Sequence, residues 1–156
     1  MKNWIPIVAL SAITLAAFPV ASSNALNQPD EAAALAISQA YLTGISGGDL
    51  DELDALFVSG DGSSVFENAS DEGTWAHYKE HHLAPEQDSV KNFKFTTKEA
   101  VAQPCGTGFL VRHAGGFSLE ADGKTRNFRA AVSFALAPTE DGLRILHVHW
   151  SSREAR

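Results

Sequence analysis

The chain has 156 residues, enough for one domain with a hydrophobic core, and a formal net charge of −7. Because no stretch is rich in Lys or Arg, the chain lacks the positive charge that nucleic acids and anionic membrane surfaces attract. Its single cysteine, Cys105, has no partner for an internal disulfide, so stability must come from packing.

The first residues have the composition of a secretory signal. Lys2 precedes an apolar run over 4–20, which is short for a membrane-spanning helix. The small residues Ser23-Asn24-Ala25 then fit the pattern that signal peptidase cleaves. We expect 1–25 to be a cleaved signal peptide and 26–156 to form one periplasmic or secreted domain. An uncleaved membrane anchor is the alternative.

Three helices are predicted in the first half. An apolar stripe at Ala34, Ile37, Tyr41 and Ile45 indicates a helix over 30–48. A second helix follows at 49–57, where Asp49 can cap it and Glu52 completes a capping box. A third is expected over 74–83, ending near Leu83 because Pro85 disfavours helical geometry at Ala84. Glu86 then need not lie one turn above His82.

Strands follow once the apolar period changes to two. A short strand is expected at 64–68, and long strands at 90–97, 108–120, 125–137 and 143–152. Gly115-Gly116 indicates a bulge or bend, and Asp122-Gly123 and 140–142 indicate turns. The fold class is therefore α+β, with helices on one face of a curved antiparallel sheet.

Strict alternation gives the last strand two different faces. Leu143, Ile145, His147, His149 and Ser151 share one face. Arg144, Leu146, Val148 and Trp150 share the other, which is largely apolar.

Three stretches, "YLTGISGGDLDELDALF", "VFENASDEGTWAHYKEHHLAPE" and "LRILHVHWSSR", carry a family resemblance. In this order they resemble the nuclear transport factor 2-like superfamily, and within it the SnoaL-like, polyketide-cyclase-like branch. The resemblance covers nearly all of 26–156. It implies a cone, in which a bent sheet wraps around helices and leaves a pocket open at one end. Members include isomerases, cyclases, hydrolases and non-catalytic binding proteins, so fold does not fix function.

In such a cone one face of the last strand points into the pocket. We expect this to be the face with His147 and His149, meeting the helix face that carries Trp75, Tyr78 and His82. The carboxylates Glu67 and Glu86 are further candidates for the same cavity.

Three chemistries fit this set. His82, His147 and His149 could act as general acids or bases, or could hold a divalent transition metal. Alternatively, these histidines, with Glu67, Trp75, Tyr78 and Glu86, could serve only to hydrogen-bond one another and to bind a ligand. No other cofactor is indicated.

The first functional interpretation is a periplasmic or secreted domain that binds a small molecule in a polar, His-containing pocket. A small-molecule isomerase, cyclase or hydrolase is the alternative, and a periplasmic divalent-metal-binding protein is a second one. The outer face of the last strand also predicts a homodimer with Trp150 at or near the contact.

Overall fold

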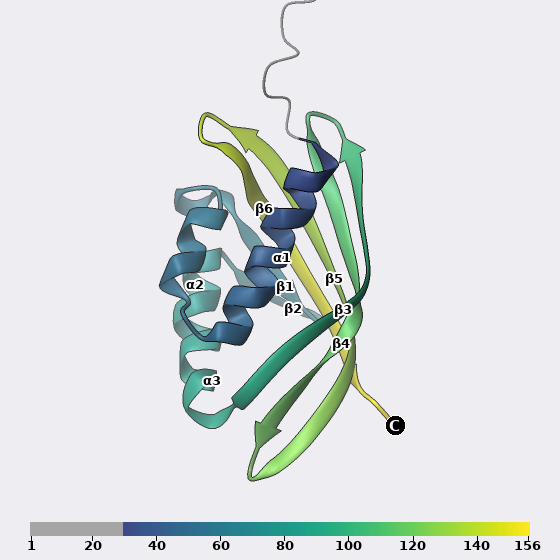
Figure 1. Cartoon of the computed structure of the whole chain (residues 1–156). Helices are drawn as coiled ribbons and strands as arrows, with labels where there is room; N and C mark the ends of the chain where they lie inside the picture. The colour runs from purple at the N-terminus through teal and green to yellow at the C-terminus, as the bar shows by residue number, and fades with distance from the viewer. Residues whose placement is uncertain (1–29) are drawn as a thin grey trace, which may run out of the picture.

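A computed structural model describes residues 30–156, so the expected signal peptide lies outside the described residues. The chain forms a helical half followed by a strand half, as the sequence predicts (Figure 1). The helical half holds α1 (Glu31–Gly47), η1 (Asp51–Leu56), η2 (Gly60–Gly62), β1 (Ser64–Glu67), β2 (Ser70–Gly73), α2 (Trp75–Tyr78), η3 (Lys79–Leu83) and α3 (Ala84–Ser89). The strand half holds β3 (Lys91–Cys105), β4 (Gly108–Ala121), β5 (Lys124–Thr139) and β6 (Gly142–Glu154).

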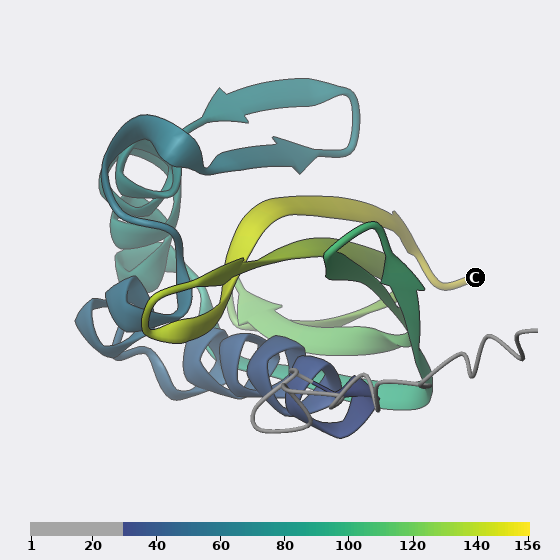
Figure 2. The same cartoon turned by 90° about the horizontal axis from the view of Figure 1, so that it is seen from above.

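The six strands form one sheet in the order β2-β1-β6-β5-β4-β3. All neighbours are antiparallel except β1 and β6, which are parallel. The sheet curves around the interior, with α1 against its concave side and the β1–β2 hairpin on the other side of the molecule (Figures 1 and 2). This confirms the α+β cone. Within 30–156, no helix is long and apolar enough to span a bilayer.

The first helix, α1, attaches to the sheet through a stripe of small and aromatic residues. Its N-terminus is capped by Asp30, whose Oδ1 accepts a hydrogen bond from the Ala33 N–H at 2.7 Å. Gly48 ends it in the left-handed conformation, with φ of 82°. Its fully buried Tyr41 makes edge contacts with Phe57, Trp75 and Phe134, and so joins the helices to β5.

The second predicted helix is a 3₁₀ helix, η1, rather than an α-helix. The expected cap is present, because Asp49 Oδ1 accepts from the Glu52 N–H at 3.4 Å. Leu53 is its one buried residue, so there is little packing to hold a longer helix.

Gly115 and Gly116 mark the bend of the sheet. A Cβ at Gly115 would collide with the Thr96 carbonyl, and one at Gly116 with the Phe128 carbonyl. The register between β3 and β4 shifts opposite Gly115, between Thr97 and Glu99. The predicted irregularity is therefore confirmed, and the extra residue lies in β3.

The third helix does not end near Leu83, and that expectation is wrong. A π-helical turn, η3, links α2 to α3, so helical backbone continues through Pro85 to Ser89. Proline lacks an N–H and clashes with the carbonyl one turn back. The wider π turn, in which the Ala84 N–H bonds to the Lys79 carbonyl, accommodates it.

The last strand, β6, contains a bulge that strict alternation did not predict. Ala135 of β5 pairs with His147, but the next residue, Leu136, pairs with Ile145. Leu146 is therefore an extra residue without a partner in β5, and it is 41% exposed. After it, the inward and outward positions of β6 are exchanged.

Candidate functional site

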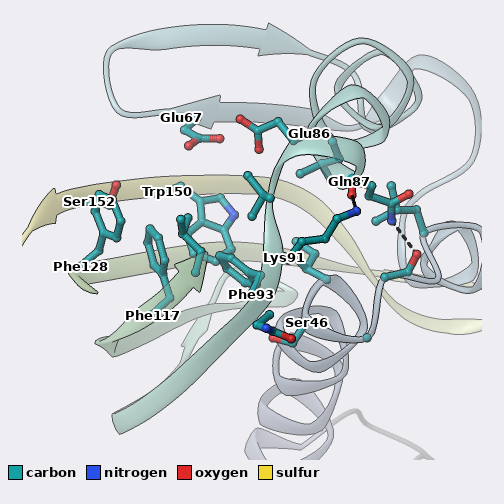
Figure 3. A pocket seen from close by; sticks show the side chains of 18 of the residues that line it. Ser46, Glu67, Glu86, Gln87, Lys91, Phe93, Phe117, Phe128, Trp150 and Ser152 are labelled. Atoms are coloured by element: carbon teal, nitrogen blue, oxygen red, sulfur yellow. Dashed lines mark hydrogen bonds between the residues drawn. The ribbon is translucent and has the colours of Figure 1, made fainter. Parts of the chain in front are cut away.

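A pocket of about 570 Å³ lies between the helices and the inner face of the sheet (Figure 3). The end of α1, the η3–α3 segment, the start of β3 and the inward residues of β4, β5 and β6 surround it. Its lining includes Ile45, Ser46, Leu50, Glu67, Asn68, Tyr78, Leu83, Glu86, Gln87, Val90, Lys91, Phe93, Phe117, Leu119, Phe128, Trp150 and Ser152. Apolar and aromatic residues outnumber polar ones in this lining, and such a combination is typical of small-molecule sites.

One wall of the pocket is aromatic. Phe117 stacks on Phe128 of the neighbouring strand, with ring centroids 4.6 Å apart. It also contacts Phe93 at 5.1 Å and the edge of Trp150 at 6.3 Å. These rings come from β3, β4, β5 and β6, so the curvature of the sheet gathers them on one concave surface.

A chain of polar contacts forms the facing wall. The Tyr78 hydroxyl donates to Glu67 Oε2 at 2.6 Å, and His82 Nε2 lies 3.4 Å from the same oxygen. Burial raises the pKa of Tyr78 above its ordinary value, and Tyr41 and Glu67 raise it further. The phenol therefore stays protonated and orients the Glu67 carboxylate at the pocket wall.

Two more glutamates surround the same histidine. His82 Nδ1 lies 3.3 Å from Glu72 Oε2, and His82 Nε2 lies 3.5 Å from Glu86 Oε1. Burial raises the pKa of Glu86; His82 opposes the rise, and Glu67 and Glu72 add to it. The η3–α3 helix supplies both His82 and Glu86, and they lie one turn apart because the helix continues past Leu83.

His147 and His149 do not face this pocket, which corrects the expected convergence. The bulge at Leu146 turns both side chains outward and turns Val148 and Trp150 inward, where they are 0% and 5% exposed. The expected outer face with Trp150 at a dimer contact is therefore not formed by these residues.

The two histidines lie on the outer side of the sheet beside β1. His147 Nδ1 is 2.8 Å from the Ser64 hydroxyl, and the Phe66 ring contacts both imidazoles, at 5.7 and 6.4 Å. Burial lowers the pKa of His147, and so does neighbouring His149. Because Glu67 and His82 lie on the inner side of β1, the sheet separates the two histidine groups.

Comparison with known proteins places this architecture in a family. The sequence profile described as the SnoaL-like domain matches residues 34–153, most of the chain. The chain belongs to the SnoaL-like domain family. This confirms the resemblance found in the sequence.

Solved structures similar to this SnoaL-like domain share its fold at low identity. A nuclear transport factor 2-like superfamily protein from Salmonella enterica serovar Typhimurium has a TM-score of 0.69 and 19% identity, over 78% of this chain and 88% of that one. A proposed scytalone dehydratase from Novosphingobium aromaticivorans has 0.68 and 11%, over 80% and 87%. The beta subunit of benzoate 1,2-dioxygenase from Burkholderia mallei has 0.66 and 7%, over 82% and 93%. Among curated proteins, no sequence relative was found. The fold of this family is typical of domains that bind a small ligand or act as isomerases or cyclases.

Trp75, expected among the ligand-binding residues of the SnoaL-like domain, belongs to the core. It is 4% exposed and stacks on Phe57 with centroids 4.4 Å apart. Its indole N–H donates to Asp54 Oδ1 at 2.7 Å, and Lys79 also binds this carboxylate. Burial would raise the pKa of Asp54, but the hydrogen bonds from Lys79 and Trp75 hold it below its ordinary value. The indole is therefore fixed by polar partners and lies outside the pocket lining.

His113, to which the sequence assigned no role, is a buried polar connection. It is 2% exposed; its Nε2 is 2.8 Å from the Ser38 hydroxyl on α1, and its Nδ1 is 3.2 Å from the Thr97 hydroxyl on β3. Burial lowers the pKa of His113. A neutral imidazole here holds α1 against the sheet.

The expected histidine metal set does not assemble. His82 lies on the inner side of β1, and His147 and His149 lie on its outer side. Over residues 30–156, no three His, Cys, Asp or Glu side chains are arranged as metal ligands.

The sequence interpretation missed Phe117, Trp150 and Glu72 as parts of the site. One signal was present for Trp150. The adjacent apolar pair Ile145-Leu146 interrupts alternation, and such an interruption is typical of a bulge that moves Val148 and Trp150 to the inner face. No comparable signal exists for Glu72, whose hairpin strand β2 is polar throughout.

Proposed function

We propose that this chain binds a small, largely apolar molecule between the aromatic wall and the Glu67–Glu86 wall. The observation that carries the proposal is the pairing of these two walls around about 570 Å³. That volume lies within the range of ligand pockets, roughly 300–1,000 Å³. Apolar contact with Phe117 and Trp150 would supply affinity, and the carboxylates would orient the polar group of the ligand.

A thermal-shift screen of aromatic and alicyclic compounds, followed by native mass spectrometry of hits, tests this proposal. A ligand that binds only the folded state raises the unfolding temperature. Leu119→Trp fills the pocket and should abolish the shift, whereas Ala40→Trp, at an exposed position of α1 outside the lining, should leave it intact. Equal shifts in both variants would contradict binding in the pocket.

Proton-transfer catalysis is the second candidate, as in an isomerase or cyclase. It is favoured by two carboxylates that flank one nitrogen of His82 and differ in environment: Glu67 accepts the Tyr78 hydroxyl, and Glu86 has a raised pKa. Glu67 would act as base and Glu86 as acid on one bound molecule.

Exchange with solvent distinguishes catalysis from binding alone. A bound carbonyl compound with an acidic C–H should acquire deuterium from D₂O in wild type. It should exchange much more slowly with Glu67→Gln, provided that this variant still binds it. Binding without exchange above the buffer rate would leave the ligand-binding proposal and reject catalysis.

We further propose that the domain acts after export, because of the signal-like composition of 1–25. N-terminal sequencing of exported protein should begin at or near Leu26, and an intact chain in the membrane fraction would contradict this.

We also propose a homodimer through the outer sheet face, now supported by exposed Phe66, Val101 and Leu110 in place of Trp150. Sedimentation at micromolar concentration should show a dimer that Phe66→Glu weakens. A monomeric wild type would reject it.

A further inference from the structure

The charge of the pocket narrows the class of its ligand. We propose that the pocket takes an organic cation: an amine with an aromatic or alicyclic body, its ammonium between Glu67 and Glu86 and its body on the Phe117–Trp150 wall. This inference rests on the proposed ligand-binding function and deepens it.

The polar wall carries more negative charge than it can neutralise internally. Three carboxylates, those of Glu67, Glu72 and Glu86, lie within 3.5 Å of the two ring nitrogens of His82. Even a fully protonated imidazole would balance only one of them. A ligand ammonium at this wall would lower that repulsion, whereas a ligand carboxylate would increase it.

Within the described lining, the protein's own basic side chains leave the place of the ligand ammonium, between Glu67 and Glu86, unfilled. Lys91 is the one basic side chain among the described pocket-lining residues, and its Nζ donates to the Gln87 carbonyl at 2.8 Å. Figure 3 shows Glu67 and Glu86 together at one side of the pocket, with Lys91 beside Gln87 on another side. Tyr78 and His82 both contact Oε2 of Glu67, and no hydrogen bond from residues 30–156 engages Oε1, so Oε1 is available to a ligand.

The aromatic wall suits the same ligand. Aromatic and alicyclic bodies bury a large apolar area when they pack on aromatic side chains. Phe117 and Phe128 are stacked with only 14° between their planes, and the Trp150 ring meets Phe117 nearly edge-on at 80°. An aromatic amine can therefore rest its ring on this wall while its ammonium reaches the carboxylates opposite.

Cation binding also changes protonation in the pocket. Burial, together with Glu67 and Glu72, raises the pKa of Glu86. An ammonium beside it would lower that pKa again, so binding should release protons to the buffer. Affinity should then increase as pH rises through the Glu86 titration.

Isothermal titration with three matched probes tests the inference: phenethylamine, phenethyl alcohol and hydrocinnamate. We expect the amine to bind about tenfold or more tightly than the alcohol, because hydrogen bonds to charged groups are the stronger ones, and the acid to bind weakest. Titration of the amine in buffers of different ionisation enthalpy should show proton release.

Charge-matched variants localise the effect. Glu67→Gln and Glu86→Gln should each reduce the preference for the amine by about tenfold. Glu80→Gln removes the same charge from an exposed helix position outside the lining and should leave the preference unchanged. Phe128→Leu should weaken the amine and the alcohol alike, because it removes a ring against which their shared body packs.

The outcomes separate the inference from the function on which it rests. If the alcohol binds as tightly as the amine and Leu119→Trp abolishes both, the pocket binds ligands but the cation inference is wrong. Equal effects of Glu80→Gln and Glu67→Gln would also overturn it, because the preference would then reflect overall charge. Binding of none of the probes, and of nothing in the wider screen, would reject both proposals.

Discussion

The bulge at Leu146 predicts a large loss of stability for one substitution in β6 and a small change for its neighbour. Val148→Ala removes two methyl groups from a side chain that is 0% exposed. At about 0.8 kcal/mol per buried carbon plus a cavity contribution, the free energy of unfolding should fall by about 2–3 kcal/mol. His149→Ala removes a larger side chain from the outer face, where surface substitutions change stability by about 0.5 kcal/mol or less.

Urea unfolding followed by circular dichroism measures both changes. The slope with urea should stay constant, so that midpoint differences report stability alone. Leu146→Ala, at the 41% exposed bulge position, is the control and should resemble His149→Ala. Strict alternation requires the reverse order, with His149→Ala the more damaging. That reverse order would refute the bulge and return His147 and His149 to the pocket.

Three further predictions concern single groups. Because burial lowers the pKa of His113, the unfolded state binds its proton more readily, and the free energy of unfolding should fall as pH drops below about 6.5. His113→Gln should flatten the dependence of this free energy on pH, measured by urea unfolding between pH 7.5 and 5. An unchanged pH dependence in the variant would contradict this role of His113. Tyr78→Phe removes the 2.6 Å bond to Glu67 and should destabilise the fold by about 1–2 kcal/mol in thermal unfolding, whereas no loss would mean that the bond contributes nothing. A pocket ligand should change the fluorescence of Trp150 and leave buried Trp75 unaffected, so Trp150→Phe should remove the signal; a signal that persists would place the ligand elsewhere.

Secondary structure was predicted correctly from the sequence wherever a single local pattern determined an element. Apolar spacing identified α1, and Gly47-Gly48 its end. Asp122-Gly123 identified the β4–β5 turn, where both residues have positive φ. In these cases the local chemistry and the global fold favour the same conformation.

It failed where tertiary packing overrode a local rule. Pro85 should have ended the third helix, but the π turn accommodates it, and His82 contacts Glu86 one turn further on. Alternation should have continued through β6, but burial of Val148 and Trp150 shifted the register. Of the expected site, Glu67, Tyr78, His82 and Glu86 come together, while Trp75, His147 and His149 lie elsewhere.

The π turn also fixes which way Glu86 points. Tyr78 and Glu86 are eight residues apart, and in a regular α-helix, at about 100° per residue, they would differ by about 80° around the axis. One extra residue in η3 makes them equivalent to a pair about seven apart, close to two full turns, so both line the pocket. Deleting one residue from 79–81 would preserve every pocket-lining side chain yet rotate the following turn, carrying Glu86 away from the face that Tyr78 shares with the pocket. In this domain the number of residues in η3, rather than the identity of any one of them, sets the direction in which Glu86 points.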